Sequence, residues 1–298
     1  MTAPTVTKPA TTLTRAPRAA GGHQRPSAVA TGILVVGALY CLIPVLWVLT
    51  AASKDTSELF STFTYAPSTH LFSNISDLTD YRNGLFWRWM LNTVLYAGVG
   101  AALSTVVSAM AGYAMAKYVF RGRAMLFNIL LAGVLVPGVV LAVPQYLLFA
   151  KFGLTNTYWS VLIPSIISPY GIYLARIYVS ASVPDEVLEA ARTDGARDGR
   201  VFTSIVVPMM LPGLVTIFLF QFVAIWNNFL LPYVMLGDDR LFPLTVGLSS
   251  LLHQGASAPA LYALVITGAL LSILPLLALF LLLQRFWQVD LAAGAVKS

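Results

Sequence analysis

The chain has 298 residues, of which 58% are hydrophobic and only 10% are charged. Because a soluble domain usually has about 25% charged residues, this composition predicts a membrane protein. The net charge is +6, but the basic residues are scattered over short segments and form no basic face, which argues against a nucleic-acid partner. The single cysteine, Cys41, excludes an internal disulfide, and the three histidines show no metal-ligand spacing, so we expect no metal site.

The first 27 residues are rich in Thr, Ala, Pro and Gly, with four basic residues and no acidic one. Such a segment buries too little apolar surface to fold, so residues 1–27 are expected to form a disordered cytoplasmic tail. The tail and the following apolar run also resemble a signal peptide with a cleavage site at Ala51-Ala52-Ser53. However, the run 28–50 is longer than the usual h-region of about 7–15 residues, which favours an uncleaved anchor helix.

Residues 28–298 are expected to form one all-α, polytopic transmembrane domain. A spanning helix needs about 20 largely apolar residues, and six stretches qualify. They are residues 28–51, 90–115, 125–149, 158–178, 209–233 and 260–284. Small residues at four-residue spacing indicate close helix contacts within these spans: Gly98, Ala102, Gly268 and Ser272. Trp87 and Trp89 are expected to anchor the second span at the membrane interface.

The distribution of Lys and Arg predicts the orientation of the six spans. If the N-terminus is cytoplasmic, the inside segments hold thirteen of these residues and the outside loops hold five. This asymmetry satisfies the positive-inside rule for a protein with both ends in the cytoplasm. The polar segment at about 180–208 would then be a cytoplasmic loop.

Within this loop, the sequence predicts two short helices joined by a glycine. Ser182 and Asp185 have capping-box spacing, so the first helix is expected over about 183–193. Gly195 would end it in the left-handed conformation. A second short helix would follow, with Phe202 and Ile205 as its apolar residues, and would lead to Pro208 at the start of the fifth span.

The residues of this loop resemble the cytoplasmic signature of the ABC-importer permeases of the carbohydrate type, related to the second permease of the maltose system. Glu-Ala-Ala alone is common in helices, but the Asp-Gly that follows and the Ile-x-x-Pro at the right distance make the match specific. The matching residues are Glu189, Ala190, Ala191, Asp194, Gly195, Ala196, Phe202, Ile205, Pro208 and Pro212. The resemblance covers most of the chain after the tail. Asn228 departs from it, because the family often has an acidic residue there, and Asp290 stands where a glycine is usual.

The resemblance implies a type I ABC-importer permease in the bacterial cell membrane, surrounded by lipid. Such an importer contains a second homologous permease that forms a heterodimer with this one, two cytoplasmic ATPase subunits and an extracytoplasmic solute-binding protein. The helix around Glu189 would couple the permease to an ATPase through the signature residues up to Pro208. Glu189 would pair with an ATPase arginine, or alternatively with Arg192 of its own helix.

No phosphate-binding loop of the form Gly-x4-Gly-Lys-Ser/Thr occurs in the sequence. The chain is therefore expected to be a transport subunit and not an enzyme, with no catalytic residues. It would bind no cofactor, and ATP and Mg²⁺ would be used by the partner ATPase.

Polar side chains inside the spans are candidates for the solute path: Asn92, Gln145, Gln221, Asn227 and Asn228. Neutral amides suit hydroxyl-rich sugars because they both donate and accept hydrogen bonds. The alternative for each residue is a hydrogen bond between helices. No carboxylate or lysine lies deep in a span, which argues against an ion-driven relay.

We therefore expect a permease subunit for a sugar or oligosaccharide delivered by an external binding protein. The alternatives are an ABC permease for a polyol, glycerol phosphate or amino acid, a secondary transporter, an intramembrane enzyme and an assembly scaffold. The terminal segment 292–297 either extends toward the ATPases or is an untethered polar end.

Overall fold

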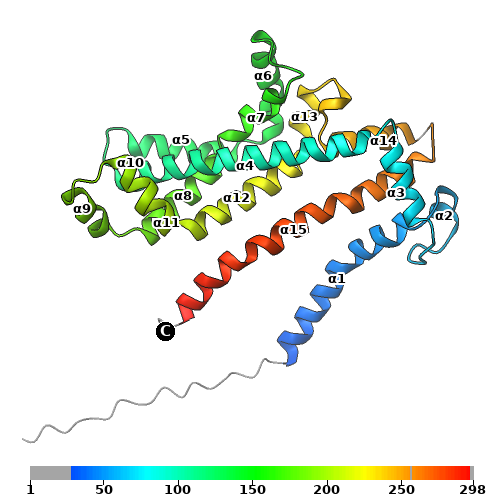
Figure 1. The fold of residues 1–298 in the computed structure, drawn as a ribbon, viewed down its shortest axis with the longest axis horizontal. Helices are drawn as coiled ribbons and strands as arrows, with labels where there is room; N and C mark the ends of the chain where they lie inside the picture. Colours follow the sequence, from blue (N-terminus) through cyan, green and yellow to red (C-terminus); the bar gives the residue numbers. More distant parts are fainter. Residues whose placement is uncertain (1–27, 256, 296–298) are drawn as a thin grey trace, which may run out of the picture. The chain divides into compact units, whose positions relative to one another are not determined.

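The structure is a computed structural model and describes residues 28–255 and 257–295. Every regular element in these residues is helical (Figure 1). The chain divides into two compact units, one ending at Val45 and the other beginning at Leu46, and α1 (Ala28–Ala52) runs across this boundary. The predicted tail over residues 1–27 lies outside the described residues.

Four helical segments are long and apolar enough to cross a membrane on their own. They are α1, α4 (Leu85–Lys117), the segment Tyr158–Ser182 and the described part of α15 (Leu261–Ala295). The segment Tyr158–Ser182 consists of α7 (Tyr158–Ile166) and α8 (Pro169–Ser182). These four confirm the helical character of four of the six predicted spans.

The third and fifth predicted spans are bent pairs of helices. α5 (Arg123–Leu135) and α6 (Gly138–Lys151) meet at 103°, and the helical segment Asp198–Met209 meets α12 (Leu211–Trp226) at 80°. The described residues thus contain four candidate spans, or up to six if each bent pair crosses once. Pro137 accounts for the first break, because proline lacks the N–H group that would continue the helix.

α4 is the centre of the unit that begins at Leu46, and it packs mainly against α8 and α12. Its buried face includes small residues at four-residue spacing, which let the helix backbones approach closely: Gly100, Ser104, Ser108 and Gly112. At Gly112, an added Cβ would lie only 2.5 Å from the Cβ of Ala175 and 2.7 Å from the backbone N of Arg176. This contact needs glycine.

The predicted close contacts of small residues are right at one glycine and wrong at another. A Cβ on Gly268 would lie 2.5 Å from a methyl group of Leu248, which confirms the prediction there. A Cβ on Gly98 would meet nothing within 4 Å, because this part of α4 turns Gly98 away from its neighbours. Trp89 is likewise buried against Gly247 rather than placed as an interfacial anchor, whereas Trp87 is exposed.

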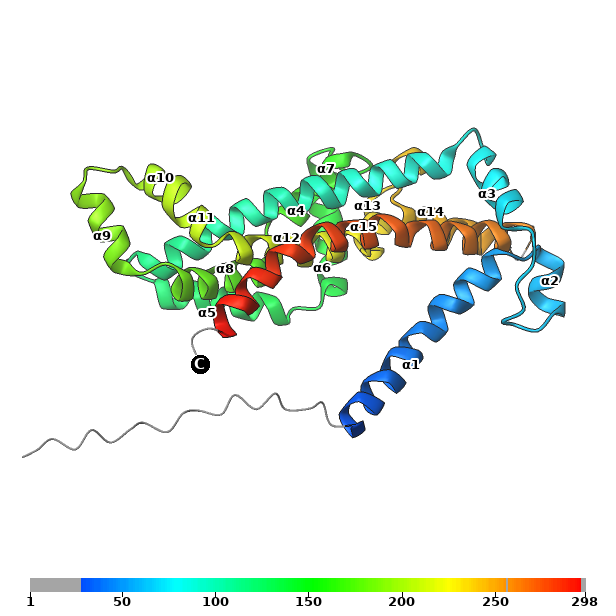
Figure 2. The same ribbon diagram turned by 60° about the horizontal axis from the view of Figure 1, so that its bottom comes forward.

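The short helices gather at the two ends of α4 (Figures 1 and 2). At one end lie α9 (Asp185–Thr193), α10 (Asp198–Val201) and α11 (Val207–Met209). At the other end lie α3 (Leu71–Asp80) and α14 (Leu244–Gly255), with α2 (Thr56–Ser61) beside α3. The buried side chain of Asn74 fixes α3 by donating hydrogen bonds to the carbonyl oxygens of Ala52 and Lys54, at 2.9 and 2.8 Å.

Candidate coupling surface and solute cavity

The predicted polar helix exists, but it begins later than its sequence suggests. α9 begins at Asp185, directly after Pro184, and no side chain caps it. The capping box predicted at Ser182 is wrong, because α8 continues through Ser182. Pro184 starts the new helix instead, since its fixed φ, here −64°, suits the residue before a first turn.

The end of α9 is as predicted. Gly195 has a φ of +82°, in the left-handed region that favours glycine. The Gly195 N–H donates to the carbonyl of Arg192 and the Ala196 N–H donates to that of Ala191, both at 3.0 Å. This pair of bonds is the Schellman motif, which satisfies the last carbonyl groups of a helix.

One face of α9 is held by an apolar cluster and the other is free. Leu188 is buried with Val183, Val201 and Val206, and Ala191 and Ala196 pack at the edge of this cluster. The remaining signature residues of α9 and its turn are exposed: Glu189, Ala190, Asp194 and Gly195. The outward surface is therefore small-residue-rich and acidic, and we call it the α9 surface.

Of the charged residues on α9, Arg192 has partners within the protein and the side chain of Glu189 has none among the described residues. Arg192 pairs with Asp198 at 3.5 Å and lies over the ring of Tyr118, 5.7 Å from its centre. Desolvation alone would lower the pKa of Arg192, but a hydrogen bond with Tyr118 and the charge of Asp198 raise it overall. Within the described residues, Glu189 forms neither the alternative pair with Arg192 nor any other side-chain hydrogen bond or ion pair. Its carboxylate is available to a partner.

Two contacts join the α9 region to the end of α4. The Lys117 ammonium donates to the Asp185 carboxylate at 2.7 Å, and the Lys117 side chain is only 9% exposed. Phe202, in the π-helical turn Phe202–Val206, lies with its ring centre 5.6 Å from that of Tyr113. Ile205 in the same turn is half-buried and Pro208 is exposed. The region is thus fixed to α4 as well as to α8.

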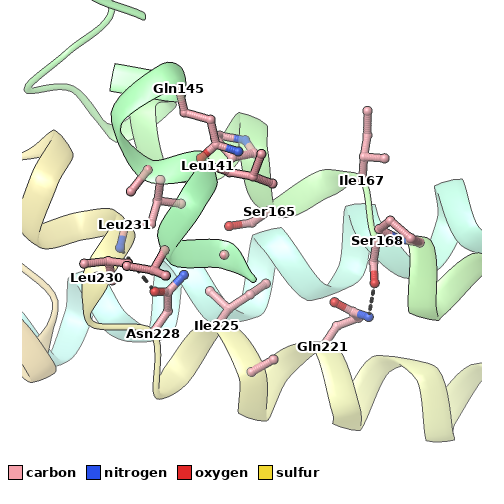
Figure 3. A pocket seen from close by; sticks show the side chains of 16 residues that line it. Leu141, Gln145, Ser165, Ile167, Ser168, Gln221, Ile225, Asn228, Leu230 and Leu231 are labelled. Atoms are coloured by element: carbon pink, nitrogen blue, oxygen red, sulfur yellow. Dashed lines mark hydrogen bonds between the residues drawn. The ribbon is translucent and has the colours of Figure 1, made fainter. Parts of the chain in front are cut away.

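A cavity of about 340 Å³ lies where several helices begin or end. It is bordered by the start of α6, the break between α7 and α8, the end of α12 and the start of α13 (Leu230–Met235) (Figure 3). Three of the five predicted solute-path residues line it: Gln145, Gln221 and Asn228. The structure therefore brings together residues that are up to 83 positions apart in sequence.

Two serines that the sequence reasoning missed also line the cavity. Ser168 caps α8 by accepting a hydrogen bond from the N–H of Gly171 at 3.0 Å, and it accepts another from Nε2 of Gln221 at 2.6 Å. Ser165 donates its hydroxyl hydrogen to the carbonyl of Val161 at 2.7 Å. Ser168-Pro169 is a helix-start signature, with a capping serine followed by proline in the first turn, and this signal could have located the break.

Asn92 and Asn227 lie outside the cavity lining. The amide of Asn92 donates to the carbonyls of Arg240 and Phe242, at 2.8 and 3.0 Å, and accepts from the hydroxyl of Tyr158 at 3.0 Å. Asn227 is exposed and donates to the carbonyl of Val223 at 2.8 Å. Asn92 thus forms the hydrogen bonds between elements that were the alternative to a solute contact. Among the described residues, Asn227 bonds only to the end of its own helix, and a role in the solute path stays a prediction for both.

The cavity lining contains no ionisable side chain. In the part of the chain that the structure describes, no group of three or more His, Cys, Asp or Glu residues is placed to hold a metal ion. The chemistry that the site offers is therefore hydrogen bonding by neutral amides and hydroxyls.

Comparison with known proteins identifies the family. Residues 104–288, which include α9 and the cavity, match the family described as binding-protein-dependent transport system inner membrane component. The chain belongs to this family. It is consequently a multi-pass protein of the bacterial inner membrane and a transport component.

Several relatives of this transport component match over almost their whole length. The arabinooligosaccharides transport system permease protein AraQ of Halalkalibacterium halodurans is 32% identical, covering 92% of this chain and 99% of the relative. The lactose transport system permease protein LacG of Rhizobium radiobacter is 31% identical, over 91% and 97%. The diacetylchitobiose uptake system permease protein NgcG of Streptomyces coelicolor is 29% identical, over 94% and 92%.

A solved structure shows the same fold. It is a chain of a bacterial ABC transporter involved in the import of the acidic polysaccharide alginate, with a TM-score of 0.74 and 24% identity. The match covers 86% of this transport component and 94% of the other chain. The fold is therefore that of a chain of a bacterial ABC importer.

Proposed function

We propose that this transport component is the permease subunit of an ABC importer that carries a sugar or oligosaccharide. The observation that carries the proposal is its near-full-length similarity to permeases named for arabinooligosaccharides, lactose and diacetylchitobiose. A polyol, glycerol phosphate or amino acid is the alternative cargo. Uptake competition with a panel of neutral sugars, polyols and amino acids would decide between them.

In the proposed assembly, the chain crosses the membrane six times with both ends in the cytoplasm and has the type I importer architecture. A second homologous permease completes a heterodimer, and an extracytoplasmic binding protein delivers the solute. Two cytoplasmic ATPase subunits bind ATP and Mg²⁺, so this chain itself needs no cofactor.

The α9 surface would dock into one ATPase. The small side chain of Ala190 permits close approach, and the unpaired carboxylate of Glu189 would accept hydrogen bonds from an ATPase arginine. Because Leu188 is buried and Lys117 binds Asp185, movement of α9 would be passed to α8 and α4 as movement of a rigid body. The cavity, which α6, α8 and α12 border, would then open alternately to the two sides.

Glu189→Lys tests this docking. The substitution replaces an exposed carboxylate that has no side-chain partner among the described residues, so folding should be unaffected. A hydrogen bond to a charged group contributes about 1.5–3 kcal/mol, so docking should weaken roughly tenfold or more. Uptake by the reconstituted importer, solute-stimulated ATP hydrolysis and co-purification of the ATPase should all fall.

Asp77→Lys is the matched control for co-purification. Asp77 is an exposed acid on α3, at the other end of α4 from α9 (Figure 1). This variant should retain the ATPase. If Glu189→Lys retains normal uptake and full co-purification, the docking role of α9 is wrong.

A further inference from the structure

We propose that the cavity beside the α7–α8 break is a transit site for one neutral, hydroxyl-bearing sugar unit, with Ser168 and Gln221 as its main hydrogen-bonding pair. This inference rests on the proposed function and assigns the solute contact on this subunit to particular groups. The cavity has a volume of about 340 Å³, which is at the lower end of the range of roughly 300–1,000 Å³ for small-molecule sites.

Three helices begin or end at the border of the cavity. Irregular backbone inside a membrane is tolerated only where protein buries it or where it lines a polar cavity. Here α6 begins after Pro137, α7 ends at Ile166, and α12 ends at Trp226, and all three ends border the same space. Their convergence indicates a site for a polar solute.

The hydrogen bonds of Ser168 and Gln221 leave a matched donor and acceptor. The Ser168 oxygen accepts two hydrogen bonds, from Gln221 and from Gly171, so both of its lone pairs are used and its own O–H is left to donate. Gln221 is buried, with 8% of its surface exposed. It donates through Nε2, and its Oε1 forms no hydrogen bond with the described residues. A sugar hydroxyl both donates and accepts, so this pair fits one hydroxyl group or two adjacent ones.

Two further amides line the cavity: Asn228 lies just beyond the end of α12, and Gln145 lies on α6 (Figure 3). Asn228 uses its oxygen to accept from the N–H of Leu231 at 3.4 Å, which leaves its NH₂ group to donate. Gln145 forms no hydrogen bond with the described residues, so both ends of its amide are available. A sugar unit in the cavity would therefore meet polar groups from α6, from the start of α8 and from the end of α12.

The composition of the lining indicates both the charge of the solute and the strength of binding. A carboxylate in this cavity would find no positive partner in the lining, and burial of an unpaired charge is costly. The lining also contains no aromatic side chain on which a sugar ring could stack. Hydrogen bonds alone give weak binding, which suits a path that the solute must enter and also leave.

Thiol protection would measure occupancy of the cavity directly. In a Cys41→Ser background, Ala224→Cys places a thiol in the lining, and Ala181→Cys places one on an exposed part of α8 outside it. The complete importer is treated with a small polar thiol reagent in the presence of lactose, arabinooligosaccharides or diacetylchitobiose. The neutral sugar that is imported should slow labelling at position 224 several-fold and leave position 181 unchanged, whereas oligogalacturonate should protect neither.

Replacing the amide side chains of Gln145 and Gln221 by leucine tests whether these residues bind the solute. Gln145→Leu removes a side chain that has no bond within the described residues, so folding should be unaffected. Each hydrogen bond lost should weaken protection at position 224 about 2- to 10-fold, and Gln221→Leu should have a larger effect because it also frees Ser168. The matched control is Gln254→Leu, an exposed amide on α14 that lies outside the lining, and it should leave protection unchanged.

The outcomes separate this inference from the proposed function. The labelling experiment uses the sugar that the unmodified importer takes up from the panel of neutral sugars. If it takes up none of that panel, the proposed function fails. If a sugar is imported but does not protect position 224 more than position 181, or if Gln145→Leu and Gln221→Leu leave protection unchanged, only the transit site is wrong. Equal protection by oligogalacturonate would overturn its preference for neutral solutes.

Discussion

Two glycines of α4 show how the effect of a substitution depends on what the residue faces. At Gly112 an added side chain would collide with the Cβ of Ala175 and with backbone atoms of α8, which cannot move aside as a flexible side chain would. Gly112→Leu should therefore force α4 and α8 apart. Overpacking usually costs about 1–3 kcal/mol. In a chain of this length each kcal/mol lowers Tm by about 2–4 °C, so we expect Tm in detergent to fall by about 2–10 °C.

Gly98→Leu is the matched control, since it adds the same side chain to the same helix where nothing lies within 4 Å. Its Tm should stay within about 1–2 °C of the parent protein. Equal losses of Tm in the two variants would contradict the view that Gly112 is the close contact of α4 with α8.

The same residues show what the sequence could predict. Small-residue spacing identified Gly268 correctly and Gly98 incorrectly, because the pattern shows which residues permit close contact but not which side of the helix has a neighbour. Asn92, Gln145 and Gln221 are equivalent as amides in a span, yet only the last two line the cavity. Their difference arises from long-range contacts, such as that of Asn92 with the carbonyl of Arg240, that no local pattern encodes.

At the scale of elements, the sequence predicted helices better than their breaks. The α9 turn was predictable because Gly195 has a local conformational role that no other residue type performs as well. The bend between α5 and α6 was not predicted, although Pro137 lies at it, because proline is also tolerated inside membrane helices when neighbours satisfy the backbone. The cavity forms where these helices break. The sequence therefore identified the amides that line it but did not predict how they are arranged around it.

The ion pair between Lys117 and Asp185 leads to a prediction about coupling between α9 and α4. Among the described residues, the pair of Lys117 with Asp185 is the only ion pair between these two helices. Lys117→Ala removes it, while Leu188 still holds α9 to the apolar cluster. Because the Asp185 end of the pair is exposed to water, the pair should contribute up to about 1 kcal/mol, so the amount of solute imported per ATP hydrolysed should fall about two- to fivefold. Assembly with the ATPase should persist, because the α9 surface is unchanged.

A charge swap separates this role from a general loss of stability. Lys117→Asp alone places two carboxylates together and should lower coupling further, whereas Lys117→Asp combined with Asp185→Lys restores opposite charges and should recover much of it. Failure of the double variant to improve on Lys117→Asp would argue that the ion pair does not transmit movement.

At the scale of the whole molecule, the α5–α6 pair decides which side of the membrane α9 faces, because it is the bent pair that lies between α3 and α9 in the chain. If this pair crosses, α9 lies on the side opposite to α3. If the α5–α6 pair enters and leaves on the same side, α9 shares the side of α3. The second arrangement would move Arg192, Arg197 and Arg200 outside, against the positive-inside rule, so we expect the α5–α6 pair to cross.

Single cysteines in a Cys41→Ser background test this topology. Exposed positions that flank the pairs are Phe152, Thr193 and Gly237, and Asp77 on α3 is the reference. A membrane-impermeant maleimide applied to intact cells should label Asp77→Cys, Phe152→Cys and Gly237→Cys, and it should label Thr193→Cys only after lysis. A re-entrant α5–α6 pair would instead exchange the sides of positions 152 and 193, because the chain between them crosses once. A re-entrant α12 pair would move position 237 to the side of position 193. The four positions together therefore distinguish every combination of crossings. They also decide whether α9 can reach a cytoplasmic ATPase.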